Sequence, residues 1–277
     1  MIKHQFKKVL LIVLFLSSPL SYAEISDESL NKILDLSGLT MQVNQFPGLI
    51  KVGMEQAKQQ GVPISDAEYS LMVTSADKSI LPSKILGEIK KSLKQSINEE
   101  EAKKLLAWYE SDLGKEITKA EEKASTPNAY QQMMQAAPSL LENSERVDFA
   151  KRLDALMGAT DMSMDIQEYS GIAVYTAMMT VMQPETPVNI EPFKAQMDAV
   201  NVQTRTAIEQ MVIVSYVYSY QNIETGKLNK YENFLTETAT IKFNKTVIES
   251  MNKGIELSVS KWADELALIL KDNNQES

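Results

Sequence analysis

Apolar residues recur three and four residues apart along most of this 277-residue chain, and this spacing constrains the fold more than any other feature. The 10 glycines and 9 prolines fall mainly at the ends of such segments, where helices begin or stop. A typical segment carries apolar or aromatic side chains at Ala102, Leu105, Leu106 and Tyr109. The pattern predicts an all-α protein.

Several helix ends can be placed from capping residues and breakers. Ser26 or Asp27 is suited to cap a first helix that stops at Gly38. Asn98–Glu101 has the pattern of a capping box, in which the first side chain binds the amide three residues on and the glutamate reaches back. Residues 224–271 are expected to form two helices with a break near 236–238.

The segment 211–220 is rich in β-branched and aromatic residues that alternate with the period of a strand. No second segment of comparable quality exists to pair with it, and a lone strand would leave its backbone groups without hydrogen bonds. We therefore predict that this segment is a buried helix.

The first 23 residues have the parts of a cleavable signal peptide. Three lysines come first, an apolar run over 9–16 follows, and small residues stand at Ser21 and Ala23. The apolar run is shorter than the ~18 residues that a transmembrane helix needs. We therefore expect cleavage after Ala23, a periplasmic location with secretion as the second choice, and no stable membrane insertion after cleavage.

The charge balance excludes two kinds of partner. The chain has 28 Lys and Arg against 37 Asp and Glu, and three of the lysines lie in the signal segment, so the mature formal net charge is −12. Nucleic acids and anionic lipids are bound through clustered basic residues, and a chain this acidic repels both. No nucleic-acid binding is expected.

Cysteine is absent, and the single histidine, His4, lies in the signal segment. The mature chain therefore has no thiolate nucleophile, no imidazole base and no His/Cys metal cluster. A hydrolase could still work with two carboxyl groups of separated pKa. However, the acidic runs 99–101 and 121–122 have the pattern of solvated helix faces. We predict no catalytic residues, no cofactor and no metal site, and the sequence favours a non-enzymatic role.

Methionines cluster between Met157 and Met182, and two interpretations stay open. The spacing of Met162 and Met164 suits thioether ligation of Cu(I). The same cluster falls on helical stripes, where methionine fills gaps in a core or lines an adaptable surface. The run 161–165 begins like a calcium loop but lacks the glycine that the sixth position requires, so calcium binding is not expected.

The chain also contains a weak internal repeat. Residues 36–40 match 156–160 at an offset of 120, and 108–117 align with 234–243 at an offset of 126. Two nearly equal offsets indicate a duplicated helical unit of about 115 residues. The alternative is that any two amphipathic helices align this well.

The repeat divides the chain into a signal peptide at 1–23, a first helical unit at 24–143 and a diverged second unit at 144–277. The mature length suffices for one large or two small cores. We expect two pseudo-repeated helical units that pack into one bundle-like body.

The segment Leu106-Ala-Trp-Tyr-Glu-Ser-Asp-Leu-Gly-Lys-Glu-Ile-Thr118 resembles the signature of DUF2059, a bacterial family of unknown function. Its members carry a phrase of the type aromatic-Tyr-x-Ser-Pro-x-Gly-x-x-Phe/Ile. Here Asp112 replaces the proline, and the related phrase at 234–243 has lost Ser-Pro and Gly. The resemblance extends over most of the mature chain. It implies an all-helical exported protein with no established activity or catalytic residues.

The motif residues of this phrase are Trp108, Tyr109, Ser111, Gly114 and Ile117. The spacing predicts a helix corner, in which Ser111 caps the following helix and Gly114 allows a neighbouring backbone to approach closely. Trp108 and Tyr109 would pack across the joint. The functional alternative is a serine nucleophile or an aromatic platform for a ligand, but no base lies nearby in the sequence.

These observations lead to two expected functions. The first is a non-catalytic periplasmic binding or adaptor protein, whose partner is another protein or a small apolar ligand held between helices. A homo-oligomer is compatible with the sequence. The second is a carboxylate-dependent hydrolase of the cell envelope.

Overall fold

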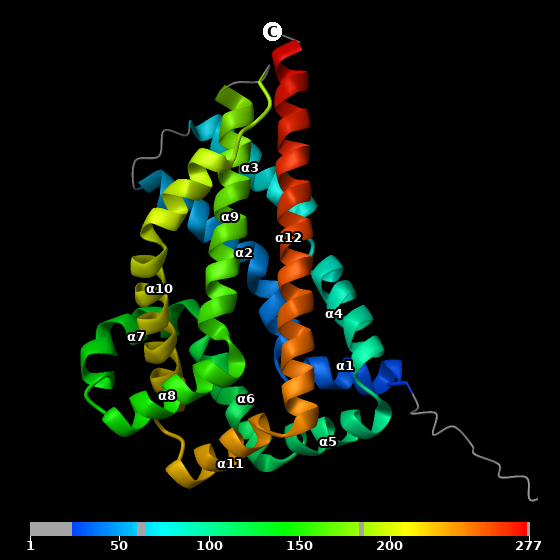
Figure 1. Ribbon diagram of the computed structural model, residues 1–277, viewed down its shortest axis with the longest axis vertical. Coiled ribbons are helices and arrows are strands. Elements are labelled where there is room, and N and C mark those ends of the chain that lie inside the picture. Colours follow the sequence, from blue (N-terminus) through cyan, green and yellow to red (C-terminus); the bar gives the residue numbers. More distant parts are fainter. Residues whose placement is uncertain (1–23, 60–64, 183–185, 276–277) are drawn as a thin grey trace, which may run out of the picture.

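The structure, a computed structural model, describes residues 24–59, 65–182 and 186–275. Within these ranges the chain forms twelve helices and no strand, apart from an isolated β-bridge between Glu24 and Asn98 (Figure 1). The helices are α1 (Asp27–Leu36), α2 (Leu39–Gln59), α3 (Asp66–Ser79), α4 (Pro82–Ser96), α5 (Glu99–Tyr109), α6 (Asp112–Ala124), α7 (Pro127–Leu140), α8 (Ser144–Met157), α9 (Ala159–Met182), α10 (Glu191–Tyr220), α11 (Thr225–Leu235) and α12 (Thr238–Gln275). The predicted all-α fold is confirmed.

The helix ends lie where the capping signals place them. Ser26 caps α1, because its Oγ accepts a hydrogen bond from the Ser29 amide at 3.1 Å. Asn98 and Glu101 form both bonds of the capping box at the start of α5, each at 2.9 Å. The break predicted near 236–238 separates α11 from α12.

Residues 211–220 form the last turns of α10, as predicted from the lack of a pairing strand. Val214, Val217 and Tyr220 lie on one face of this helix and are buried. The helix packs against α6, α8 and α9. The β-branched and aromatic side chains therefore fill a helical interface, and the backbone amides of this segment are bonded within the helix.

The longest helix, α12, runs along the molecule beside α9 and α4 (Figure 1). Gly254 sets its approach to α4, because a Cβ at this position would lie 3.0 Å from the Cα atom of Ile85. Further along, the ring of Trp262 is 1% exposed, and its Nε1 donates a hydrogen bond to Ser75 Oγ at 2.9 Å. A large apolar ring is thus buried against α3 with its polar group satisfied.

Helices from both predicted units contribute to the same core. The boundary at 143/144 lies between α7 and α8, but α12 of the second unit packs against α3, α4 and α5 of the first. The main cluster of buried apolar side chains accordingly contains residues of α1 to α5 together with residues of α8, α11 and α12. The duplication itself stays a prediction.

No helix within the described ranges combines the length and the apolar character needed to cross a membrane. The predicted signal peptide, residues 1–23, lies outside those ranges. Export to the periplasm therefore stays a prediction from the sequence.

Candidate functional site

Residues 108–117 form a sharp turn between two helices, which we call the α5–α6 corner. Ser111 holds this corner: its Oγ accepts a hydrogen bond from the Gly114 amide at 3.0 Å and donates one to the Trp108 carbonyl at 2.6 Å. A Cβ on Gly114 would lie 2.1 Å from the same carbonyl oxygen. Only glycine fits there, because the obstacle is backbone and cannot rotate away.

The aromatic side chains of the α5–α6 corner face helices of the second half. The ring of Trp108 stacks on Phe234 of α11, with centroids 4.4 Å apart and planes inclined by 7°. Tyr109 meets Phe234 at 5.7 Å and Phe243 of α12 at 6.5 Å, edge to face. Ile117 is buried, at 2% exposed. The five motif residues therefore lie together at a packed joint between α5–α6 and α11–α12.

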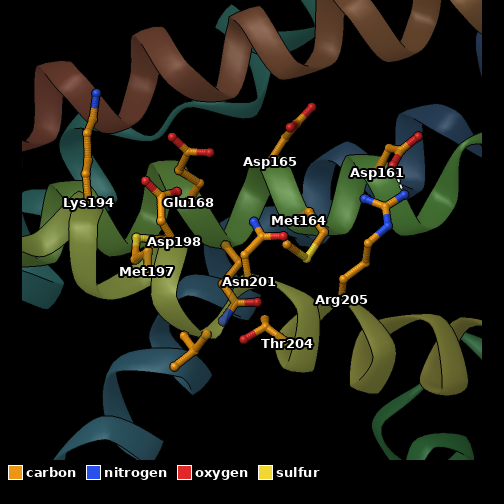
Figure 2. A pocket seen from close by; sticks show the side chains of 12 residues that line it. Asp161, Met164, Asp165, Glu168, Lys194, Met197, Asp198, Asn201, Thr204 and Arg205 are labelled. Carbon is orange, nitrogen blue, oxygen red and sulfur yellow. Dashed lines mark hydrogen bonds and ion pairs between the residues drawn. The ribbon is translucent and has the colours of Figure 1, made fainter.

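A separate pocket of about 500 Å³ lies between α9 and α10 (Figure 2). Residues 161–168 of α9 form one wall and residues 194–205 of α10 form the other. On each helix the lining side chains recur at spacings of mostly three and four, so each wall is one helical face. None of the five residues of the corner motif lines this pocket.

Two contacts between the helices bound the pocket along its length. At one end, Arg205 of α10 forms an ion pair with Asp161 of α9 (Figure 2). Beyond the other end, Phe193 packs on Gly171, where a Cβ would lie 3.1 Å from the ring, and stacks on Tyr175 at 4.8 Å. The packing at Gly171 and the exposed ion pair therefore mark the two ends of the stretch over which α9 and α10 face each other.

The pocket lining carries more negative than positive charge. Four carboxylates, those of Asp161, Asp165, Glu168 and Asp198, stand against two cations, Lys194 and Arg205. Of the two cations, Arg205 is already paired with Asp161. The lining thus offers a negative potential to a bound molecule.

Asp165 is the carboxylate whose surroundings differ most from water. Burial raises the pKa of its side chain, and the negative charge of Asp161 one turn away raises it further. Its Oδ2 accepts a hydrogen bond from Asn252 Nδ2 of α12 at 2.5 Å, and Figure 2 shows the carboxyl directed toward that helix. Asp165 therefore links the pocket wall to α12.

The predicted methionine cluster is divided by the fold. Met157 packs against the main core, and its sulfur accepts a hydrogen bond from Asn244 Nδ2 at 3.3 Å. Met164 lines the pocket instead and faces the α10 side, where Met197 contributes a second thioether (Figure 2). The side chain of Met182 lies outside the described residues. Met157 and Met164 therefore lie in different parts of the structure.

The sequence interpretation missed the α10 wall of this pocket. Met197, Asp198, Asn201 and Arg205 follow one another at helical spacing, which is a readable signal. A mixed polar stripe of this kind normally faces solvent, however. It lines a site only because α9 packs opposite α10, and the local sequence pattern does not reveal which helices pack together.

Among the described residues, no group of three or more His, Cys, Asp or Glu side chains is arranged to hold a metal ion. The run 161–165 that resembled a calcium loop is part of α9, so its acids lie on a helix and do not converge as loop ligands do. The chemistry that this pocket offers is binding through charge and through contact with two thioethers.

Comparison with known proteins supports the resemblance seen in the sequence. The family described as "Uncharacterized protein conserved in bacteria (DUF2059)" matches residues 83–143, from the start of α4 to the turn after α7. This segment includes the α5–α6 corner, whereas the α9–α10 pocket and the phrase at 234–243 lie outside it. No curated protein and no solved structure matches the chain significantly.

Proposed function

We propose that this protein is a non-catalytic binding protein of the bacterial cell envelope, and that the α9–α10 pocket is its ligand site. The observation that supports this proposal is a pocket of about 500 Å³ that two facing helices line with polar and charged side chains. This volume lies within the range of small-molecule sites, and the space between helices is a common place for them.

The residues that line the pocket narrow the class of ligand that the sequence suggested. The carboxylates of Glu168 and Asp198 are exposed, and an apolar molecule that covered them would remove their water without replacing it. A molecule with a positive charge and a short apolar part satisfies both components, because the charge meets the carboxylates and the apolar part meets Met164 and Met197. We therefore propose an organic cation as the ligand class.

Calorimetric titration of the mature protein tests this proposal. The probes are a short-chain alkylammonium ion, the neutral alcohol of the same chain length and the corresponding carboxylate. We expect heat of binding for the cation alone, and a weaker affinity at high ionic strength because salt screens exposed charges. Equal binding of the neutral alcohol would overturn the assignment of a cationic ligand.

Variants locate the binding site. Glu168→Gln and Asp198→Asn should each weaken binding of the alkylammonium probe by up to about fivefold, which corresponds to the ~1 kcal/mol upper range of an exposed ion pair. Asp264→Asn is the matched control, since it removes the same charge from an exposed position of α12 that does not line the pocket. A loss of the same size in this control would place the cation elsewhere.

One observation favours the second candidate function, a carboxylate-dependent hydrolase. Asp165, whose pKa is raised by burial, lies in the same pocket lining as the carboxyl groups of Glu168 and Asp198, and an enzyme of this kind works with a pair of carboxyl groups. Incubation with peptidoglycan fragments tests this role. Turnover by the wild-type protein that is lost in Asp165→Asn would establish the hydrolase, and equal product levels in both would exclude Asp165 as its acid.

A further inference from the structure

A half-buried carboxyl group, that of Glu121, lies at the joint between α6 and the α10–α11 region. The hydroxyl of Tyr220 donates a hydrogen bond to Glu121 Oε1 at 2.5 Å, and the hydroxyl of Tyr231 donates to the same oxygen at 3.0 Å. These tyrosines are 1% and 7% exposed, so they cover the carboxyl from α10 and α11. The expectation from the sequence that Glu121 is a solvated helix position is therefore wrong.

The two bonds fall on one oxygen of the carboxyl group. Both hydroxyl groups donate to Oε1, which leaves Oε2 able to carry a proton. Burial raises the pKa of Glu121, and this effect outweighs the two tyrosine bonds, which lower it. The neutral form is thus the one that suits the packed joint.

Among the described residues, the other ionisable groups around Glu121 do not supply a compensating positive charge. Tyr109 of α5 and Tyr216 of α10 feel its charge, and the neighbouring carboxylate of Glu122 raises its pKa further. The cation that bridges α6 and α11, Lys227, contacts both carboxylate oxygens of Glu116, at 2.9 and 2.6 Å. On the remaining sides, Asp154 of α8 acts on Tyr216, and α7 presents Tyr130, which is half exposed.

We propose that Glu121, Tyr220 and Tyr231 form a proton-controlled latch that closes the α10–α11 region onto α6 while the carboxyl is protonated. When the carboxyl ionises, its charge requires water, and the joint loosens to admit it. Glu121 lies in the segment that matches the bacterial family, and the latch joins that segment to helices α10 and α11. It does not depend on the function of the α9–α10 pocket.

The sign of the pH dependence follows from proton binding. The folded protein keeps the proton of Glu121 above the ordinary carboxyl pKa of 4.5, whereas the unfolded chain releases it there. The contribution of Glu121 to stability is therefore largest below that value and is lost as the pH rises through the pKa of the folded state. Each unit between the two pKa values multiplies the unfolding constant by about ten.

Denaturant unfolding of the mature protein between pH 4.5 and 8 tests the latch, with Glu121→Gln as the variant. Glutamine stays neutral and keeps an oxygen that can accept both tyrosine bonds. We expect the unfolding constant of the wild-type protein to rise with pH relative to that of the variant, by up to about tenfold per unit. Glu122→Gln is the control: it removes the same charge one residue further on and should keep the rise, which ends at a slightly lower pH because the charge of Glu122 contributes to the raised pKa of Glu121.

Two further measurements test the latch in the wild-type protein and do not require Glu121→Gln to fold. In the wild-type protein, carbon-13 NMR should show the Glu121 carboxyl titrating at higher pH than the exposed glutamates. Amide hydrogen exchange of residues 225–235, corrected for intrinsic rates, should accelerate above that pH. Titration together with the exposed glutamates, or protection that does not change across it, would overturn the latch.

Discussion

The α5–α6 corner has a counterpart in the α11–α12 corner, residues 234–243, and the two pack against each other. In each, the amide three residues beyond the first aromatic side chain donates a hydrogen bond to that residue's carbonyl: Ser111 to Trp108 at 2.9 Å, and Glu237 to Phe234 at 3.1 Å. The two aromatic rings, which occupy equivalent positions, are the ones that stack at 4.4 Å. The same backbone turn therefore occurs on both sides of one joint.

The two corners differ in the side chains that support this turn. The first uses the Ser111 cap and Gly114, whereas the second has Glu237 and Thr240 at the equivalent positions. Thr240 is fully buried, and its hydroxyl oxygen has no hydrogen-bond partner among the described residues. A backbone turn of this kind thus does not require glycine. The requirement arises in the first corner, where the Trp108 carbonyl leaves no room for a Cβ.

The two corners resemble each other, but the two predicted helical units differ in the helices that they contain. Three helices, α2 to α4, lie between Gly38 and α5, whereas two, α9 and α10, lie between Gly158 and α11. Both glycines adopt left-handed conformations, with φ of +74° and +61°, and each separates two helices. These local correspondences favour the predicted duplication, which stays a prediction because the intervening helices differ.

The largest difference between the corners should appear on adding a side chain to the glycine. Gly114→Val places a Cβ 2.1 Å from a carbonyl oxygen, so the corner must open and the stacked rings must separate. We expect a loss of more than ~4 kcal/mol in the free energy of unfolding, or no folded protein. Thermal and denaturant unfolding would measure it, and a variant as stable as the wild type would show that the corner is not tight.

Truncation of the two stacked rings should give unequal losses. Phe234 is 3% exposed, whereas Trp108 is half-buried. Phe234→Ala should cost about 3–5 kcal/mol through the cavity that it leaves, and Trp108→Ala should cost less because water can reach part of the space. Unfolding of both variants beside the double variant also measures their coupling. If Trp108→Ala unfolds like the wild type but abolishes a binding activity, the corner is a recognition site.

Loss of the cap should have a smaller effect. Ser111→Ala removes the acceptor for the Gly114 amide at the start of α6. We expect a cost of about 1 kcal/mol, as for other helix caps. Glu237→Ala at the equivalent position is the comparison, and a loss of equal size there would show that the cap is not what distinguishes the first corner.

The smallest change is expected at the buried hydroxyl of the second corner. Thr240→Val keeps the shape of the side chain and removes the oxygen that lacks a partner. Stability should rise by up to ~1 kcal/mol, because the buried hydroxyl no longer lacks its hydrogen bonds. A clear fall in the unfolding midpoint would instead indicate that the hydroxyl is satisfied by water.

Much of the local architecture could be predicted because helix ends depend on neighbouring residues. The cap at Ser26, the capping box at Asn98 and the turn at Ser111 each involve side chains and amides only three residues apart. The helical state of 211–220 followed from the lack of any pairing strand. The candidate site could not be predicted in this way, since its walls are separate stretches of α9 and α10.

The sequence by itself determined an acidic, all-helical chain and placed its corners, because helical hydrogen bonds join residues four positions apart and leave their periodicity in the pattern. Tertiary structure alone decided which polar residues face one another. Glu121 looks like any exposed helix position until Tyr220 and Tyr231, 99 and 110 residues away, cover it. The pairing of helices sets burial, and burial converts an ordinary carboxylate or methionine into part of a site.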